Sequence, residues 1–115
     1  MDRLRKRHQF QRVFSEGKKV VTPSLLLFIS PAETDSLRLG LSVSKKVGKA
    51  VVRNRVKRII REAFRMAEKE LKKEGITLDG LDVVVVPRRG AVEAKSTQLL
   101  MEIIDKFREL RCDNS

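Results

Sequence analysis

The sequence has no tryptophan or tyrosine, and its 115 residues include one cysteine and one histidine. Cys112 has no second thiol with which to form an internal disulfide, so the fold is expected to be stable without one. A pair with His8 would be the only thiol-based catalytic dyad, and nothing in their spacing supports it. There is no secretory signal and no apolar run long enough to span a bilayer. These features favour one domain, residues 1–115, in a reducing cytoplasm.

The sequence also lacks the patterns that usually supply catalytic or metal-binding groups. Gly48-Lys49-Ala50 fails the phosphate-loop pattern, because position 50 is neither Ser nor Thr. No set of His, Cys and carboxylate residues has the spacing of a metal site. Glu62 lies among many cations, so we expect it to pair with Arg58 or Arg65 rather than to act as a base. We therefore expect no catalytic side chain and no metal ligand in the protein.

Positive charge is abundant and unevenly distributed. The chain has 26 Lys and Arg residues against 15 Asp and Glu, a net charge of +11. Residues 1–19 contain seven basic and two acidic residues, and residues 45–65 contain nine basic and one acidic, whereas residues 66–115 are nearly neutral. A protein charged only for solubility would spread its charge, so this distribution predicts one face that binds a polyanion. Nucleic acid is the favoured partner, with an anionic membrane surface as the weaker alternative.

The second basic block is predicted to form the start of a long helix over residues 52–74, closed by Gly75, because its apolar residues recur with a period near 3.6. The polar residues on one flank are Arg53, Asn54, Lys57, Arg58, Arg61 and Arg65. Arg55 points to the other flank. Like charges four residues apart repel each other, and cations in a first turn oppose the helix dipole. The arrangement indicates a bound polyanion rather than a solvated face. Gly48 precedes the helix at its expected entrance, where backbone N–H groups could also meet phosphate.

Three strands and two further helices are predicted around this long helix. A helix over residues 7–16 should end at Gly17. Strands over residues 25–30 and 37–43 should be joined by a polar hairpin loop, residues 31–36. Residues 81–87 contain four consecutive valines, a pattern typical of a strand buried on both faces.

The last helix should begin near Ser96 as its cap. The predicted fold class is α+β, a single-domain α-β-β-α-β-α sandwich of a mixed sheet with helices. The second and third strands and the long helix between them form a candidate βαβ unit, which requires parallel strands and by default crosses over right-handedly.

Three of the five phenylalanines are candidates for stacking against unpaired bases, since single strands are held by a basic groove that offers aromatic faces. Phe10 and Phe14 are one helical turn apart, and Phe28 shares a strand face with Leu26. If residues 37–43 pair alongside, that face also carries Arg38, Gly40 and Ser42, and the small residues among these leave room for a chain of nucleotides. Packing in the core is the alternative for these three aromatics. Phe64 and Phe107 are predicted to be core residues.

The basic run resembles the signature of the bacterial ribonuclease P protein subunit. The matching residues are Lys45, Lys46, Gly48, Ala50, Val51, Arg53, Asn54, Arg55, Lys57, Arg58, Arg61, Glu62 and Arg65. The resemblance covers almost the whole chain, including the helix with Phe10 and Phe14, the stretch 40–46, a late apolar strand and a final helix.

The resemblance implies a holoenzyme in which a large catalytic RNA, with Mg²⁺ bound mainly by that RNA, removes the 5′ leader of precursor tRNA. It also implies one protein per RNA and a ribosomal-protein-like fold with a left-handed βαβ crossover, which overrules the default hand. The residues implied to bind the catalytic RNA are Lys45, Lys46, Arg53, Asn54, Arg55, Lys57, Arg58, Arg61 and Arg65. Those implied to bind the leader, between the first helix and the sheet, are Phe10, Phe14, Leu26, Phe28, Arg38 and Ser42.

Two other functions fit the residues. A ribosomal or general RNA-binding module would bind RNAs of any structure equally tightly. A metal-dependent nuclease would cleave the leader without any RNA subunit. Binding and cleavage measurements on the protein alone separate these alternatives from the ribonucleoprotein subunit.

Overall fold

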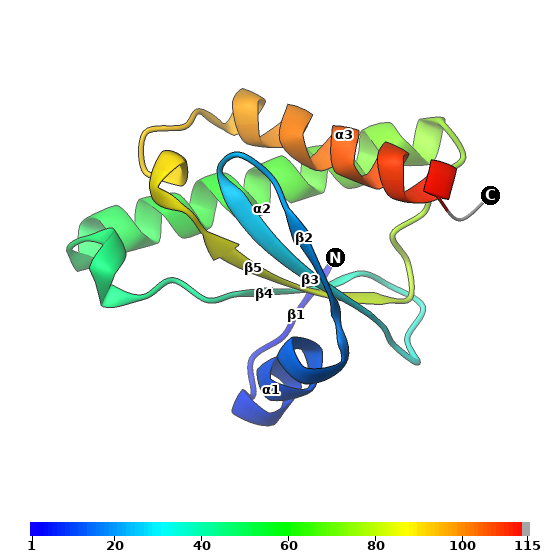
Figure 1. Cartoon of the computed structure of the whole chain (residues 1–115), viewed down its shortest axis with the longest axis horizontal. Coiled ribbons are helices and arrows are strands. Elements are labelled where there is room, and N and C mark those ends of the chain that lie inside the picture. Colours follow the sequence, from blue (N-terminus) through cyan, green and yellow to red (C-terminus); the bar gives the residue numbers. More distant parts are fainter. Residues whose placement is uncertain (114–115) are drawn as a thin grey trace.

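The computed structural model describes residues 1–113, which form three α-helices and a five-stranded sheet (Figure 1). In chain order the elements are β1 (Asp2–Arg3), α1 (Arg7–Glu16), β2 (Lys18–Val21), β3 (Leu25–Pro31), β4 (Arg38–Leu41), α2 (Ala50–Lys73), β5 (Leu81–Pro87) and α3 (Ser96–Asp113). Single 3₁₀ turns, Lys45–Val47 and Arg89–Ala91, precede α2 and α3. No helix among the described residues is long and apolar enough to cross a membrane.

The α+β class and all three predicted helices are confirmed, but the predicted element order is wrong by two strands. β1 and β2 were missed, so the order is β-α-β-β-β-α-β-α. Both missed strands are short and lie at the two edges of the sheet, and Val20 is the one buried residue that they contain. Such strands give no periodic apolar signal. Ser96 is the first residue of α3 rather than the residue that precedes it.

The predicted hairpin between β3 and β4 is also wrong, because the sheet order is β1-β4-β5-β3-β2. β5 lies between them, antiparallel to β3 and parallel to β4. Its four valines are buried or half-buried, so the central position removes the most apolar surface from water. The parallel pairing of β4 with β5 around α2 confirms the predicted βαβ unit.

One face of the sheet packs against α2 and α3 and forms the main core (Figure 1). Leu25 and Leu27 of β3 and Val83 and Val85 of β5 are fully buried on this face. The helices contribute buried side chains that include Ile60, Phe64, Leu99, Ile103 and Phe107. Phe64 and Phe107 are therefore core residues, as predicted.

The opposite face carries α1 (Figure 1), which packs Val13 against Leu4 and Val84. Strand register arranges the side chains of this face in three rows. The first row is Ser30, Asp82 and Arg38, the second is Phe28, Val84 and Gly40, and the third is Leu26, Val86 and Ser42. α1 covers the first two rows, and all three residues of the third row are half-exposed.

The two predicted helix ends are confirmed, for different physical reasons. Gly75 follows α2 with φ +78 and donates its N–H to the Lys72 carbonyl, while Ile76 donates to Leu71, so the helix closes in a Schellman motif. Gly17 has an ordinary φ of −78, but a Cβ there would lie 2.4 Å from the Val13 carbonyl oxygen. Gly17 is therefore required for close approach, not for a left-handed backbone.

Candidate nucleic-acid interface

The predicted polar flank of α2 faces outward, and we call its six residues, Arg53, Asn54, Lys57, Arg58, Arg61 and Arg65, the basic stripe. All six are exposed or half-exposed. Arg58, Arg61 and Arg65 line one hollow of about 420 Å³ together with Arg3 of β1. The two basic blocks of the sequence therefore meet at this hollow, although they are more than fifty residues apart along the chain. Such a concentration of guanidinium groups suits phosphate.

Arg61 has the most perturbed environment in the basic stripe. Burial lowers the pKa of its guanidinium, and the nearby charge of Arg3 lowers that pKa further. An anion in the hollow would relieve the repulsion between the two groups. Glu62 lines the same hollow, but among residues 1–113 it forms no salt bridge with Arg58 or Arg65, so the predicted pairing is wrong.

The N-terminal end of α2 adds backbone donors to this surface. Lys49 precedes the helix without a side-chain hydrogen bond to its first turn, and that turn contains no acidic residue. The first N–H groups of the helix therefore have no side-chain acceptor, and the turn that precedes the helix carries the exposed side chains of Lys45 and Lys46. Gly48, with φ +150, makes the turn between Lys45–Val47 and α2. Arg55 is exposed and remains outside the basic stripe.

The aromatic side chains gather where α1 meets the sheet, and we call Phe10, Phe14, Phe28 and Leu26 the aromatic patch. The rings of Phe14 and Phe28 make an edge-to-face contact, with centroids 4.8 Å apart and an interplanar angle of 78°. Phe14 is 39% exposed, whereas Phe10 and Phe28 are half-buried against Leu4, Val13 and Val84. The patch is thus anchored in the smaller core and still presents an aromatic surface.

The sequence predicted that Gly40 leaves room for nucleotides, and this prediction is wrong. A Cβ at Gly40 would lie 2.8 Å from the ring of Phe10, so that ring already occupies the space above this glycine. Open space lies instead at the third row, where Leu26 and Ser42 are half-exposed.

Arg38 is on the predicted face but is held by a neighbour. Its Nε and Nη2 donate to the two carboxylate oxygens of Asp82, which is fully buried, and this bonding raises the pKa of Arg38. Arg12 of α1 donates to the same carboxylate. Asp82 thus neutralises part of the charge that Arg38 could offer to RNA.

Sequence reasoning missed several residues of this region, namely Arg3, Arg12, Asp82, Arg88 and Arg89. A carboxylate at the start of a buried valine strand was a usable signal, because such a group needs cationic partners. Arg88 and Arg89 line a second hollow of about 570 Å³ with Lys46 and Leu26. This hollow extends the aromatic patch toward the loop before α2 with three further cations.

Comparison with known proteins identifies the family. The family model for ribonuclease P matches residues 1–111. The chain belongs to the ribonuclease P protein family. It is thus a protein component of a tRNA-processing ribonuclease complex, and membership implies association with ribonuclease P RNA.

Individual relatives cover most of the chain. The ribonuclease P protein component of Caldanaerobacter subterraneus is 40% identical over 107 residues, which are 93% of this chain and 86% of that protein. The protein component of Bacillus pumilus is 37% identical over 109 residues, 94% of this chain and 87% of its relative.

Solved ribonuclease P proteins have the same fold. The structure from Thermotoga maritima superposes with a TM-score of 0.76 at 30% identity and covers 95% of this chain and 97% of that one. The structure from Staphylococcus aureus gives a TM-score of 0.73 at 31% identity, with coverage of 96% and 95%. The α+β fold with a mixed sheet that the sequence predicts is therefore the fold of this family.

Proposed function

We propose that the chain binds the catalytic RNA of ribonuclease P through the basic stripe and the 5′ leader of precursor tRNA through the aromatic patch. One observation carries the proposal: Arg3 of β1 meets Arg58, Arg61 and Arg65 of α2 in one hollow. An isolated helix is destabilised by like charges so close together, so their clustering points to a bound anion. A polyanion supplies the opposite charge that this surface lacks.

The leader is proposed to lie along the third row of the sheet, beside Phe14 and Phe28. An exposed aromatic ring gives an unpaired base a stacking surface, and the hollow with Lys46 and Arg89 offers cations for the phosphates that follow. In this proposal Arg38 does not contact the leader. Its hydrogen bonds to Asp82 fix the sheet surface on which the leader lies.

The chemistry is proposed to belong to the RNA. Mg²⁺, held mainly by the catalytic RNA, supplies the activated water for endonucleolytic removal of the leader. The protein, at one copy per RNA, raises substrate affinity by adding positive charge near the leader. The substrate that it holds in place in turn raises the occupancy of those metal sites. Among the described residues no group of three His, Cys, Asp or Glu side chains could hold a metal ion.

Reconstitution with the cognate RNA at low Mg²⁺ tests the proposal. The protein is expected to speed leader removal and to tighten binding of precursor tRNA more than binding of mature tRNA. Unchanged cleavage would contradict it. Equal affinity for RNAs of any structure would favour a general RNA-binding module, and leader cleavage by rigorously RNA-free protein would favour a protein nuclease.

A further inference from the structure

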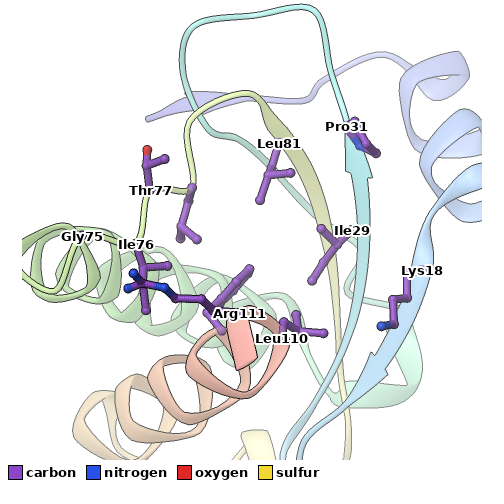
Figure 2. Close-up of a pocket in the computed structure, with 11 residues that line it drawn as sticks. Lys18, Ile29, Pro31, Gly75, Ile76, Thr77, Leu81, Leu110 and Arg111 are labelled. Atoms are coloured by element: carbon purple, nitrogen blue, oxygen red, sulfur yellow. The ribbon is translucent and has the colours of Figure 1, made fainter. Parts of the chain in front are cut away.

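An apolar pocket of about 570 Å³ opens at the end of the sheet where β3 finishes and β5 begins, on the side of α2 and α3 (Figure 2). Its lining comes from β2, β3, the loop after α2, the start of β5 and the last turns of α3. The apolar lining residues are Ile29, Ile76, Leu78, Leu81, Phe107 and Leu110. A pocket of this volume is in the range that takes a small organic ligand.

The pocket is built on a rigid frame. Leu78 and Phe107 are buried, at 1% and 5% exposure, and belong to the main core. The loop that forms one wall is held at one end by the Schellman motif at Gly75. At the other end Gly80 has φ +81, donates its N–H to the Ser36 carbonyl and accepts from Ala32. A preformed wall lowers the entropic cost of binding a ligand.

Apolar surface faces into the pocket without a cover from the described chain. Ile29, Ile76, Leu81 and Leu110 are each only partly buried, although each packs against the core cluster. Figure 2 shows Ile29, Leu81 and Leu110 converging on the same space from two strands and a helix. A ligand that filled this space would remove the apolar surface of all of them from water.

The charged lining residues have one sign. Lys18 and Arg111 lie on opposite sides of the pocket (Figure 2), and no carboxylate of the described residues lines it. Arg111 donates to the Glu74 carbonyl oxygen at 2.9 Å. Lys18 forms no salt bridge with any acidic side chain of residues 1–111, so its ammonium is the charge that we assign to the ligand.

We propose that this pocket binds a small amphipathic anion, an apolar body seated on Ile29, Leu81 and Leu110 with one carboxylate or similar group beside Lys18. The pocket lies across the sheet from Phe14 and beyond the last turn of α2, whereas the basic stripe ends at Arg65. The ligand therefore leaves both proposed RNA surfaces free. This inference does not rest on the proposed function, because the free protein carries the whole site.

Titration of the full-length protein with 4-phenylbutyrate, followed by NMR of backbone amides and of Ile and Leu methyl groups, tests the site. Saturable shifts are expected for the methyl groups of Ile29, Ile76, Leu81 and Leu110, and none for Leu26. The neutral analogue 4-phenylbutanol should bind more weakly. Ile76→Trp, which fills the pocket from its loop wall, should abolish the shifts.

Two adjacent lysines provide a matched pair of variants. Lys18 and Lys19 are both exposed on β2, but Lys18 lines the pocket, whereas Lys19 pairs in register with Phe28 and points to the α1 face. Lys18→Gln should weaken binding of 4-phenylbutyrate roughly two- to fivefold, the range for a solvent-accessible ion pair, and Lys19→Gln should leave it unchanged. Equal losses in both variants, shifts confined to the aromatic patch, or no saturable binding would each overturn the proposal.

Discussion

The guanidinium of Arg38 holds the carboxylate of Asp82 by two hydrogen bonds, from Nε to Oδ1 and from Nη2 to Oδ2, each at 2.6 Å. Arg12 of α1 donates to the same carboxylate and to the Ser30 hydroxyl. One buried acid thus ties α1 to two central strands. At about 100° per residue, Phe10 and Phe14 lie on the opposite flank of α1 from Arg12, so this network sets how the aromatic patch sits on the sheet.

Replacing Asp82 by Asn should destabilise the fold. The change leaves Arg12 and Arg38 without their anionic partner, and we expect the free energy of unfolding to fall by about 2–3 kcal/mol, less than for a fully buried pair because both arginines are partly exposed. Urea denaturation measures the loss. Asp79→Asn, at an exposed neighbouring position, is the control and should change little. A variant as stable as the wild type would show that the network contributes no net stability.

Replacing Phe14 by Ala should weaken leader binding while leaving the fold intact. The ring is 39% exposed, and loss of one stacked base costs roughly 1–3 kcal/mol. The measurement is the affinity of the reconstituted holoenzyme for precursor tRNA relative to mature tRNA. Met101→Ala, which removes an exposed apolar side chain from α3, should leave that ratio unchanged. If Phe14→Ala instead unfolds the protein, the ring is a core residue.

Replacing Arg61 by Ala should reduce the salt dependence of RNA binding. Removing one cation that neutralises a phosphate lowers the slope of log affinity against log salt by about 0.7–0.9. Filter binding or fluorescence anisotropy across a salt series gives the slope. Lys72→Ala removes the same charge from the same helix, but in its last turn, and should have no effect on the slope. Equal slopes for both variants would place the RNA elsewhere.

Replacing Arg3 by Ala should weaken RNA binding about as much as one substitution in the basic stripe. Arg3 lines the same hollow and lowers the pKa of Arg61, so its loss removes a phosphate ligand that the motif alone did not include. The same salt series measures the effect. Arg5→Ala, at a nearby exposed position of the same basic block, provides the comparison. A result in which Arg5 matters and Arg3 does not would contradict the structural assignment.

Glu102 should make stability depend on acidity. Burial would raise the pKa of this carboxyl, but hydrogen bonds from Thr22, from the N–H and hydroxyl of Ser24, and from Gln98 lower it below its ordinary 4.5. Because the folded pKa is depressed, the stabilisation is complete above 4.5 and is lost as pH falls through the folded value.

Glu102→Gln should therefore be less stable than the wild type at neutral pH, and the difference should shrink in acid. Thermal unfolding over a pH series measures it. Glu93→Gln, an exposed residue before α3, should show no such convergence. If the stability difference between the wild type and Glu102→Gln grew as the pH fell, the assigned direction of the Glu102 pKa shift would be wrong.

Much of the fold was predictable because the longer elements carry strong local patterns. The apolar period of α2, the valine run of β5 and the stripe of α3 gave their type and approximate bounds. β1 and β2 were not predictable, since two to four mostly exposed residues gain their structure only by pairing with a strand elsewhere in the chain. The position of β5 between β3 and β4 was missed because strands that are adjacent in the sequence need not be adjacent in the sheet.

The sequence by itself determined the charge of the basic stripe and which residues form it, because a helical period of 3.6 places Arg53, Lys57, Arg61 and Arg65 on one flank whatever surrounds them. Only the tertiary structure decided which partners these groups meet. Arg3 joins Arg61 because β1 pairs with β4 beside α2, whereas Arg38 is neutralised because β5 brings Asp82 next to it. Such contacts depend on strand order, and strand order is set by which segments bury the most apolar surface together.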